Sequence, residues 1–325
     1  MKLSYFIDHI VSIFIIYNQS LILFKSFKRL YSMSLENITE LVGLIEQQTA
    51  KKILLQLPDG LRQYATEIAD KLQEKNIETI ISTSPCYGAC CLAEQEAIDT
   101  KSDLLVHIGH NDFGFMDMPR KAKVPVLFYP WKLQIEFTEL DENEIKESKI
   151  GLVSTIQYMD ELEKIKQILK NKQCTVLGQT LGCITPVIPE GVEAIVYLGT
   201  GHFHPTAFVN IKVYRVDPVS GNIDIVEKDE FIEQKKKAAA LSKLDDASTV
   251  GILVSSYLGQ RKIDQAMEIK KKMEKRDKKT YIIYVGEINE KILKELDIDA
   301  FINTACPRIR QDYLGKPVIN SIDLE

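Results

Sequence analysis

The segment KILLQLPDGL, residues 52–61, is the part of the chain that most clearly decides the fold. Its apolar run over 52–57 has the length of a buried strand, and it ends in the turn sequence PDG. An amphipathic stretch follows over 61–75, and further apolar runs follow at 78–82 and 103–110. Strands that alternate with helices in this way are typical of βαβ units on a parallel sheet.

The same order of predicted elements recurs twice further along the chain. The middle copy has strands at 149–154, 174–178 and 193–200 and a helix at 160–172. The last copy has strands at 249–255, 280–285 and 299–304 and helices at 262–275 and 289–296. We therefore predict an α/β protein made of three similar small domains with parallel sheets. Their expected bounds are 33–135, 136–245 and 246–325, with linkers near 131–148 and 217–247.

Composition limits the classes of function that the chain can have. Of its 325 residues, 45% are apolar and 27% are charged, and the formal net charge is −5. This composition excludes a disordered chain, and six cysteines are too few for a secreted disulfide framework. A nucleic-acid-binding protein would show a basic surplus, so no nucleic-acid partner is expected. The lysine-rich runs 235–237 and 270–279 have acids among or beside them, which indicates solvated helix faces. We expect a cytoplasmic protein.

Residues 1–32 differ from the rest of the chain. They hold seven of the 26 aromatic residues and carry four basic residues against one acidic residue. The uncharged stretch 9–24 is shorter than the ~20 apolar residues that span a bilayer, and no signal-peptide cleavage site follows it. Met33 stands directly before a predicted helix over 35–48, whose Ile38, Leu41, Val42 and Ile45 share one face. Our hypothesis is that translation begins at Met33, and we expect no membrane association.

Each predicted domain places a cysteine just beyond the carboxyl end of a strand. Cys90 lies in SPCYGACC after 78–82, Cys183 lies in QTLGCITP after 174–178, and Cys306 lies in NTACPR after 299–304. Open α/β sheets bind their ligands at these strand ends, so the three thiols are candidates for one common site. Cys174 begins a predicted strand and is interpreted as a buried apolar filler.

The spacing of the cysteines leaves two kinds of site open. Three thiolates suit either zinc or an iron–sulfur cluster. A structural zinc site prefers four protein ligands in close pairs, and no CxxC pair is present. The CxxxCxxC pattern of the usual radical enzymes that use S-adenosylmethionine is also absent, because Ala93 stands where its third cysteine would be. A cluster held by three thiolates would leave one iron open.

Strand-end loops elsewhere are candidate walls of the same site. Asp59 lies in the loop 57–61, where it is also a plausible helix cap. Gly109 and Gly199 lie in the glycine-containing loops 108–114 and 198–205.

A further loop, SSYLGQR over 255–261, has Gly259, which permits a close backbone approach, and Gln260, which has an amide suited to an amino-acid ligand. His202 and His204 lack a third ligand nearby, so a metal site there is not expected.

Five motifs together resemble one known family. They are LPDGL (57–61), YGAC (87–90), LGTGHFHP (198–205), VSSYLGQR (254–261) and ACPRI (305–309). In this order they resemble the archaeal diphthamide synthase subunit, that is, the 2-(3-amino-3-carboxypropyl)histidine synthase family. The resemblance covers roughly residues 36–325. It implies three α/β domains in a pseudo-threefold triangle around a central 4Fe–4S cluster, with Cys90, Cys183 and Cys306 as ligands. Cys86 and Cys91 are alternatives to Cys90.

The resemblance also implies a reaction and its partners. The reduced cluster would give one electron to S-adenosylmethionine, and the 3-amino-3-carboxypropyl group would be transferred to C2 of a histidine of translation elongation factor 2. This is the first step of diphthamide biosynthesis, by noncanonical radical chemistry. The family implies a homodimer and a one-electron donor. Asp59, Gly109, Gly199 and Gln260 are the expected S-adenosylmethionine walls, and no catalytic residue beyond the cluster is expected.

Two other functions stay open at this stage. Quinolinate synthase resembles the same design, and its open iron acts as a Lewis acid on a small substrate. Alternatively, the cysteines hold zinc or a cluster in an accessory subunit that does not itself catalyse a reaction. The ligand that binds, S-adenosylmethionine or dihydroxyacetone phosphate, separates the two enzymes. Iron, sulfide and zinc analysis separates an iron–sulfur protein from a zinc protein.

Overall fold

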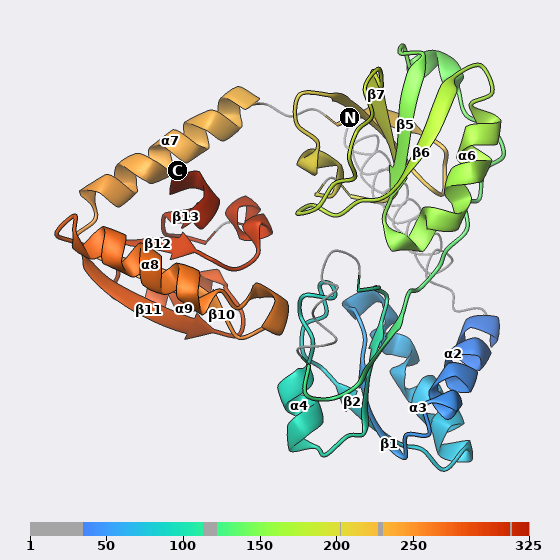
Figure 1. Cartoon of the computed structure of the whole chain (residues 1–325), viewed down its shortest axis with the longest axis horizontal. Coiled ribbons are helices and arrows are strands. Elements are labelled where there is room, and N and C mark those ends of the chain that lie inside the picture. Colours follow the sequence, from blue (N-terminus) through green and yellow to red (C-terminus); the bar gives the residue numbers. More distant parts are fainter. Residues whose placement is uncertain (1–34, 113–121, 202, 227–229, 313, 325) are drawn as a thin grey trace, which may run out of the picture.

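The chain forms three lobes, each built around its own sheet. The computed structural model describes residues 35–112, 122–201, 203–226, 230–312 and 314–324. Figure 1 shows the three lobes set in a triangle. The predicted α/β class with three mainly parallel sheets is confirmed. Residues 1–32 lie outside the described residues, and among those described no helix is both long enough and apolar enough to cross a bilayer.

The first lobe contains a four-stranded parallel sheet. Its elements are α2 (Leu35–Gln47), β1 (Lys52–Gln56), the 3₁₀ helix η1 (Asp59–Tyr64), α3 (Ala65–Glu74), β2 (Glu78–Ser82), α4 (Glu94–Asp99), β3 (Leu104–Ile108) and β4 (Val126–Tyr129). The strand order is β2-β1-β3-β4. The predicted apolar face of α2 is confirmed, because Ile38, Leu41, Val42 and Ile45 are all buried against this sheet.

The second lobe contains five strands. Its elements are η2 (Glu142–Glu144), β5 (Lys149–Ser154), η3 (Ile156–Glu161), α6 (Leu162–Ile168), β6 (Gln173–Gln179), β7 (Ala194–Leu198), η4 (Pro205–Ala207), β8 (Lys212–Val216) and β9 (Ile223–Ile225). The strand order is β6-β5-β7-β8-β9, and β9 runs antiparallel to β8. The helix predicted over 160–172 is shorter than expected, because residues 160–161 belong to the 3₁₀ helix η3 and the α-helix ends at Ile168.

The third lobe repeats the design of the first. Its elements are α7 (Glu230–Asp246), β10 (Thr249–Ser255), η5 (Leu258–Gln260), α8 (Ile263–Glu274), β11 (Lys279–Val285), α9 (Glu290–Glu295), β12 (Ala300–Asn303), η6 (Pro307–Gln311), β13 (Val318–Asn320) and η7 (Ser321–Leu324). The order β11-β10-β12-β13 matches β2-β1-β3-β4, and all pairs are parallel.

One carboxylate plays the same structural part in each lobe. Asp103, Glu193 and Asp299 each stand directly before the third strand of their sheet. Each accepts two backbone N–H groups at the start of the first strand, with N–O distances between 2.8 and 3.1 Å. A shared contact of this kind, at equivalent positions, supports the descent of the lobes from one repeated unit.

Two features of the chain were not predicted. The outer strands β4, β8, β9 and β13 are absent from the sequence-based expectation. The stretch 217–247 was expected to be a linker, but it contains β9 and the 17-residue helix α7. α7 belongs to the third lobe because Leu244 is buried in that lobe's core, with Ala240 and Leu241 packed beside it. The expected linker near 131–148 also has packed residues, since Ile135, Phe137 and Leu140 contact the second core.

Candidate metal centre

The three cysteines predicted as ligands come from three lobes and lie near one another. Cys90 follows β2, Cys183 follows β6 and Cys306 follows β12. Burial raises the pKa of Cys90 to about 12, and negative charge on Cys306 and Cys183 contributes to the rise. Burial and then the charge of Cys306 raise the pKa of Cys183 as well. The fold therefore brings three thiols that are distant in sequence into one region.

The spacing of these thiols is too wide for a single metal ion. Among the described residues, the group of three whose ligand atoms all lie within 4.8 Å of one another is Cys86, His107 and His110. Cys90, Cys183 and Cys306 do not form such a group. Zinc–sulfur bonds of about 2.3 Å place any two ligand sulfurs at most about 4.6 Å apart. A multi-iron cluster does not need its thiolates this close together, because each thiolate binds a different iron.

The loop that carries Cys90 is held by the third lobe. The side-chain amide of Gln260 donates to Sγ of Cys90 at 3.2 Å, and the backbone N–H of Gly259 donates to the Cys90 carbonyl at 3.1 Å. A Cβ atom at Gly259 would lie 2.6 Å from Cα of Cys90, which no real contact allows. Gly259 thus permits a close backbone approach, as predicted, and the chain it approaches is the Cys90 loop.

Cys86 and Cys91 face the interior of the first lobe. Sγ of Cys91 is fully buried, donates to the Pro85 carbonyl at 2.9 Å and accepts the Tyr87 N–H at 3.3 Å. Cys86 lies among His107, His110 and the carbonyl of Ile108. Neither makes the contact with the third lobe that Cys90 makes, which favours Cys90 as the ligand from this loop.

Cys183 lies in a tight loop beside a histidine. Leu181 and Ile184 form an isolated antiparallel bridge around it, and the backbone N–H of Gly182 donates to Nδ1 of His204 at 3.1 Å. A Cβ atom at Gly182 would overlap the ring of Phe203. The loop is therefore held against the segment after β7, and Cys183 is partly desolvated by its surroundings but still accessible to solvent.

Cys306 is positioned by a buried asparagine. Asn303, at the end of β12, is 1% exposed and donates to the Cys306 carbonyl at 2.8 Å. The same amide also donates to Oδ1 of Asn320 on β13. Burial raises the pKa of Cys306, whereas the backbone N–H and the charge of Arg308 lower it. The positive charge of Lys262 lowers the pKa of both Cys306 and Cys183. These two cations offset the mutual repulsion of thiolates at the centre.

The residues predicted to line the S-adenosylmethionine site differ in their contacts. Asp59 is exposed and pairs with Arg62 at 3.0 Å. Gly109 has a φ of 88° and donates its N–H to Tyr129, and its carbonyl accepts from Gln157 of the second lobe at 2.6 Å. Gly199 occupies the equivalent place after β7 and donates to Val216.

Gln260 contacts Cys90, as described above. His202 lies outside the described residues.

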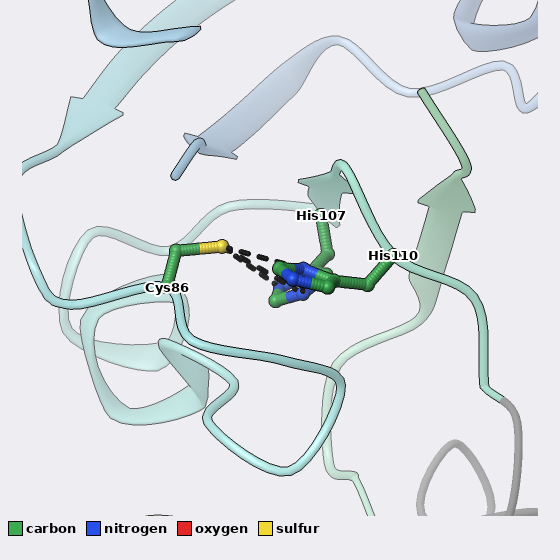
Figure 2. A group of neighbouring side chains, drawn as sticks. All are labelled: Cys86, His107 and His110. Atoms are coloured by element: carbon green, nitrogen blue, oxygen red, sulfur yellow. Dashed lines mark hydrogen bonds between the residues drawn. The ribbon is translucent and has the colours of Figure 1, made fainter. Parts of the chain in front are cut away.

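A second cluster of ligand-type side chains was not predicted. Figure 2 shows Cys86, His107 and His110 pointing toward one another. Burial lowers the pKa of His107 well below its ordinary value, and burial lowers that of His110 to about 4, so both are neutral at pH 7. The signal in the sequence was the spacing HIGH over 107–110, which places two imidazoles at a strand end.

Fold and site together define a three-lobed α/β protein whose strand-end loops converge on a shared group of thiols.

The chain belongs to the family described as "Putative diphthamide synthesis protein", whose model matches residues 57–325. It is 31% identical over 309 residues to the 2-(3-amino-3-carboxypropyl)histidine synthase of Pyrococcus horikoshii, covering 88% of each chain. It is 30% identical to subunit 1 of the human 2-(3-amino-3-carboxypropyl)histidine synthase, covering 67% of that protein. The predicted family membership is therefore confirmed.

The fold agrees with solved structures of this family. The crystal structure of Dph2 from Pyrococcus horikoshii with a 4Fe-4S cluster matches with a TM-score of 0.77 at 31% identity, covering 89% of both chains. A second crystal structure of the same protein matches with a TM-score of 0.78. The three-lobed arrangement inferred from the motifs is thus the arrangement of a solved relative.

Proposed function

We propose that this chain catalyses the first step of diphthamide biosynthesis. In that step the 3-amino-3-carboxypropyl group of S-adenosylmethionine is transferred to C2 of a histidine of translation elongation factor 2. Family membership and the names of the relatives support a transferase of this pathway. The observation that carries the proposal is the meeting of Cys90, Cys183 and Cys306 from three lobes.

The donor set fits a 4Fe–4S cluster. Three thiols from separate loops lie too far apart for one zinc ion, and two nearby cations, Lys262 and Arg308, balance their negative charge. A cluster with three protein thiolates keeps one iron free of protein ligands. The solved relative with a 4Fe-4S cluster supports the same cofactor here. When bound, such a cluster supplies the single electron needed to break a carbon–sulfur bond of a sulfonium substrate.

The protein itself orients and protects the substrate. Each thiol stands in a loop with a defined fixing contact: Gln260 at Cys90, His204 at the Cys183 loop and Asn303 at Cys306. Asp59, Gly109, Gly199 and Gln260 are proposed to line the space for S-adenosylmethionine. The approach of Gly259 to the Cys90 loop closes the contact between the first and third lobes. Close contact of the lobes excludes water from a reactive intermediate.

The partners follow from the same proposal. Elongation factor 2 is the protein substrate, a one-electron donor reduces the centre, and the chain acts as a homodimer in the cytoplasm. All three candidate ligands are present in one chain, which favours a catalytic subunit over an accessory one. The family membership favours this function over a quinolinate-synthase-like reaction.

Transfer of labelled substrate tests the function. The protein is reconstituted and reduced with dithionite without oxygen, then mixed with the elongation factor and S-adenosylmethionine labelled in the aminocarboxypropyl group. Label is expected on the factor with the wild type and with Cys174→Ala, a cysteine on β6 that is remote from the centre. Label is expected to be lost in Cys183→Ala and Cys306→Ala. Labelled small products without transfer would overturn the protein substrate, and no cleavage at all with an intact cluster would overturn the transferase.

A further inference from the structure

Cys86, His107 and His110 have the geometry of a preformed three-ligand metal site. Sγ of Cys86 lies 3.7 Å from Nε2 of His107 and 3.9 Å from Nδ1 of His110, and the two nitrogens lie 3.1 Å apart. A tetrahedral zinc ion with its usual bond lengths places two ligand nitrogens about 3.4 Å apart, and a nitrogen and a sulfur about 3.6 Å apart. The three atoms are therefore already close to the corners of a zinc coordination sphere.

The hydrogen bonds of Gln56 define which nitrogen of His107 is free to bind. The Gln56 amide nitrogen donates to the carbonyls of Pro85 and Cys91, at 3.0 and 2.8 Å, so its side-chain oxygen is the acceptor. That oxygen lies 2.9 Å from Nδ1 of His107, which must then carry the proton. In a neutral imidazole, Nε2 is left with the lone pair and faces Nδ1 of His110 at 3.1 Å. Sγ of Cys86 lies beside the His107 ring, 3.7 Å from Nε2 and 4.0 Å from Nδ1. Histidines that bind a metal through one ring nitrogen typically donate the N–H of the other nitrogen to such an acceptor.

The local fold brings His110 back over His107. Gly109 has a φ of 88°, and this left-handed turn reverses the chain directly after β3. The imidazole centroids lie 5.1 Å apart, and the ring of Phe128 packs edge-on against His107 at 5.4 Å. Cys86 and His107 are 4% and 0% exposed, whereas His110 is half-buried and gives access from solvent. Two neutral imidazoles whose nitrogens face each other at 3.1 Å are joined either by the N–H of one ring, which donates to the lone pair of the other, or by a metal ion that both lone pairs bind.

We propose that Cys86, His107 and His110 form a second metal site, which takes zinc through one thiolate and two imidazoles and keeps a fourth position for water. One sulfur and two nitrogen ligands suit this borderline ion, and three protein ligands are the number found in open zinc sites. The site differs from the three-cysteine centre in its ligands, since it joins Cys86 to two histidines of the first lobe, whereas Cys90 is held by Gln260 of the third lobe. Cys86 and Cys90 share one loop, so a bound ion would fix the loop that supplies Cys90.

Zinc binding to the full-length chain tests the site. The background is a triple variant, Cys90→Ser with Cys183→Ser and Cys306→Ser, which removes the other thiol centre. After metal removal it is expected to bind one zinc per chain in equilibrium dialysis. Cobalt(II) in place of zinc is expected to give tetrahedral d–d bands and a sulfur-to-cobalt charge-transfer band. Adding Cys86→Ser should abolish the charge-transfer band and weaken zinc binding at least about tenfold.

A second variant keeps the test valid if the buried cysteine is needed for folding. His110→Asn changes the half-buried ligand, so it should weaken zinc binding by a similar factor while the charge-transfer band of Cys86 persists. Cys174→Ala is the matched control and should leave both readouts unchanged. The proposal is overturned if the triple variant binds no zinc, which would mean that a proton alone joins the two histidines. It is equally overturned if zinc binds with unchanged affinity after both Cys86→Ser and His110→Asn.

Discussion

The side-chain amide of Gln260 donates to Sγ of Cys90 at 3.2 Å, although the two residues are 170 positions apart in the chain. Next to this contact, the Gly259 N–H donates to the Cys90 carbonyl. The first and third lobes thus meet through backbone and side chain at one proposed cluster ligand. The position of that ligand depends on both lobes.

Gly259→Ala should disturb this contact. Its new Cβ would lie 2.6 Å from Cα of Cys90. Because Cα is a backbone atom, the clash can be relieved only if the whole Cys90 loop moves. We expect a loss of about 1–3 kcal/mol in stability, as for other overpacked sites, and a several-fold loss of bound iron. Denaturant unfolding and iron analysis measure these effects. Gly43→Ala is the control, since nothing lies within 4 Å of its Cβ and alanine favours the helix. Equal behaviour of the two variants would contradict the close contact.

A reciprocal amide pair should couple the first and second lobes. Asn111 donates to Gln179 at 2.8 Å, and Gln179 donates back to Asn111 at 2.9 Å. In a double-mutant cycle with both residues changed to alanine, we expect a coupling energy of about 1 kcal/mol, because the second change removes no further contact. Urea unfolding gives the four free energies. Asn111→Ala combined with Asn289→Ala, a helix cap in the third lobe, should instead be additive.

The carboxylate of Asp299 should give acid-sensitive stability. The backbone N–H of Thr249, with its hydroxyl and the N–H of Ser248, holds the pKa of Asp299 below its ordinary value of 3.8. A lowered folded-state pKa means that the contribution is present above pH 3.8 and is lost as the pH falls through the folded-state pKa. Asp299→Ala should therefore cost about 1 kcal/mol at pH 7, the size of a lost helix cap, and progressively less below pH 3.8.

Thermal unfolding at several pH values checks this prediction. Asp297→Ala, at a neighbouring exposed position, should behave like the wild type throughout. If the loss of thermal stability caused by Asp299→Ala stayed constant down to pH 2, the stabilisation would not depend on the charge of the carboxylate.

Sequence patterns located three of the strands with their bounds. The predicted bounds 78–82, 149–154 and 249–255 are those of β2, β5 and β10. These strands are apolar runs closed by charged or turn residues, so local sequence alone defines them. β13 has only three residues, and it forms because Asn303 and its neighbours on β12 pair with it. α7 was missed because most of its residues are charged or small, and its few packed residues, such as Leu244, are visible only with the third lobe in place.

The site was only partly predictable for a similar reason. A cysteine just beyond a strand in each lobe is a local signal, and together with the family resemblance it indicated Cys90, Cys183 and Cys306 as candidates. The partner of Cys90 comes from another lobe, so no local pattern could assign Gln260 to it. His107 lies inside an apolar strand and was interpreted only as part of that strand, because its hydrogen bond to Gln56 depends on strand pairing.

The metal content of single cysteine variants tests the central claim most directly. After anaerobic reconstitution, the wild type and Cys174→Ala should each hold about four iron and four sulfide ions per chain, as a 4Fe–4S cluster requires. Cys90→Ala, Cys183→Ala and Cys306→Ala should each lose most of both, while Cys86→Ala and Cys91→Ala retain them if folded. Retention of the full cluster in any of the first three variants, or stoichiometric zinc without sulfide in the wild type, would contradict a cluster held by one cysteine from each lobe.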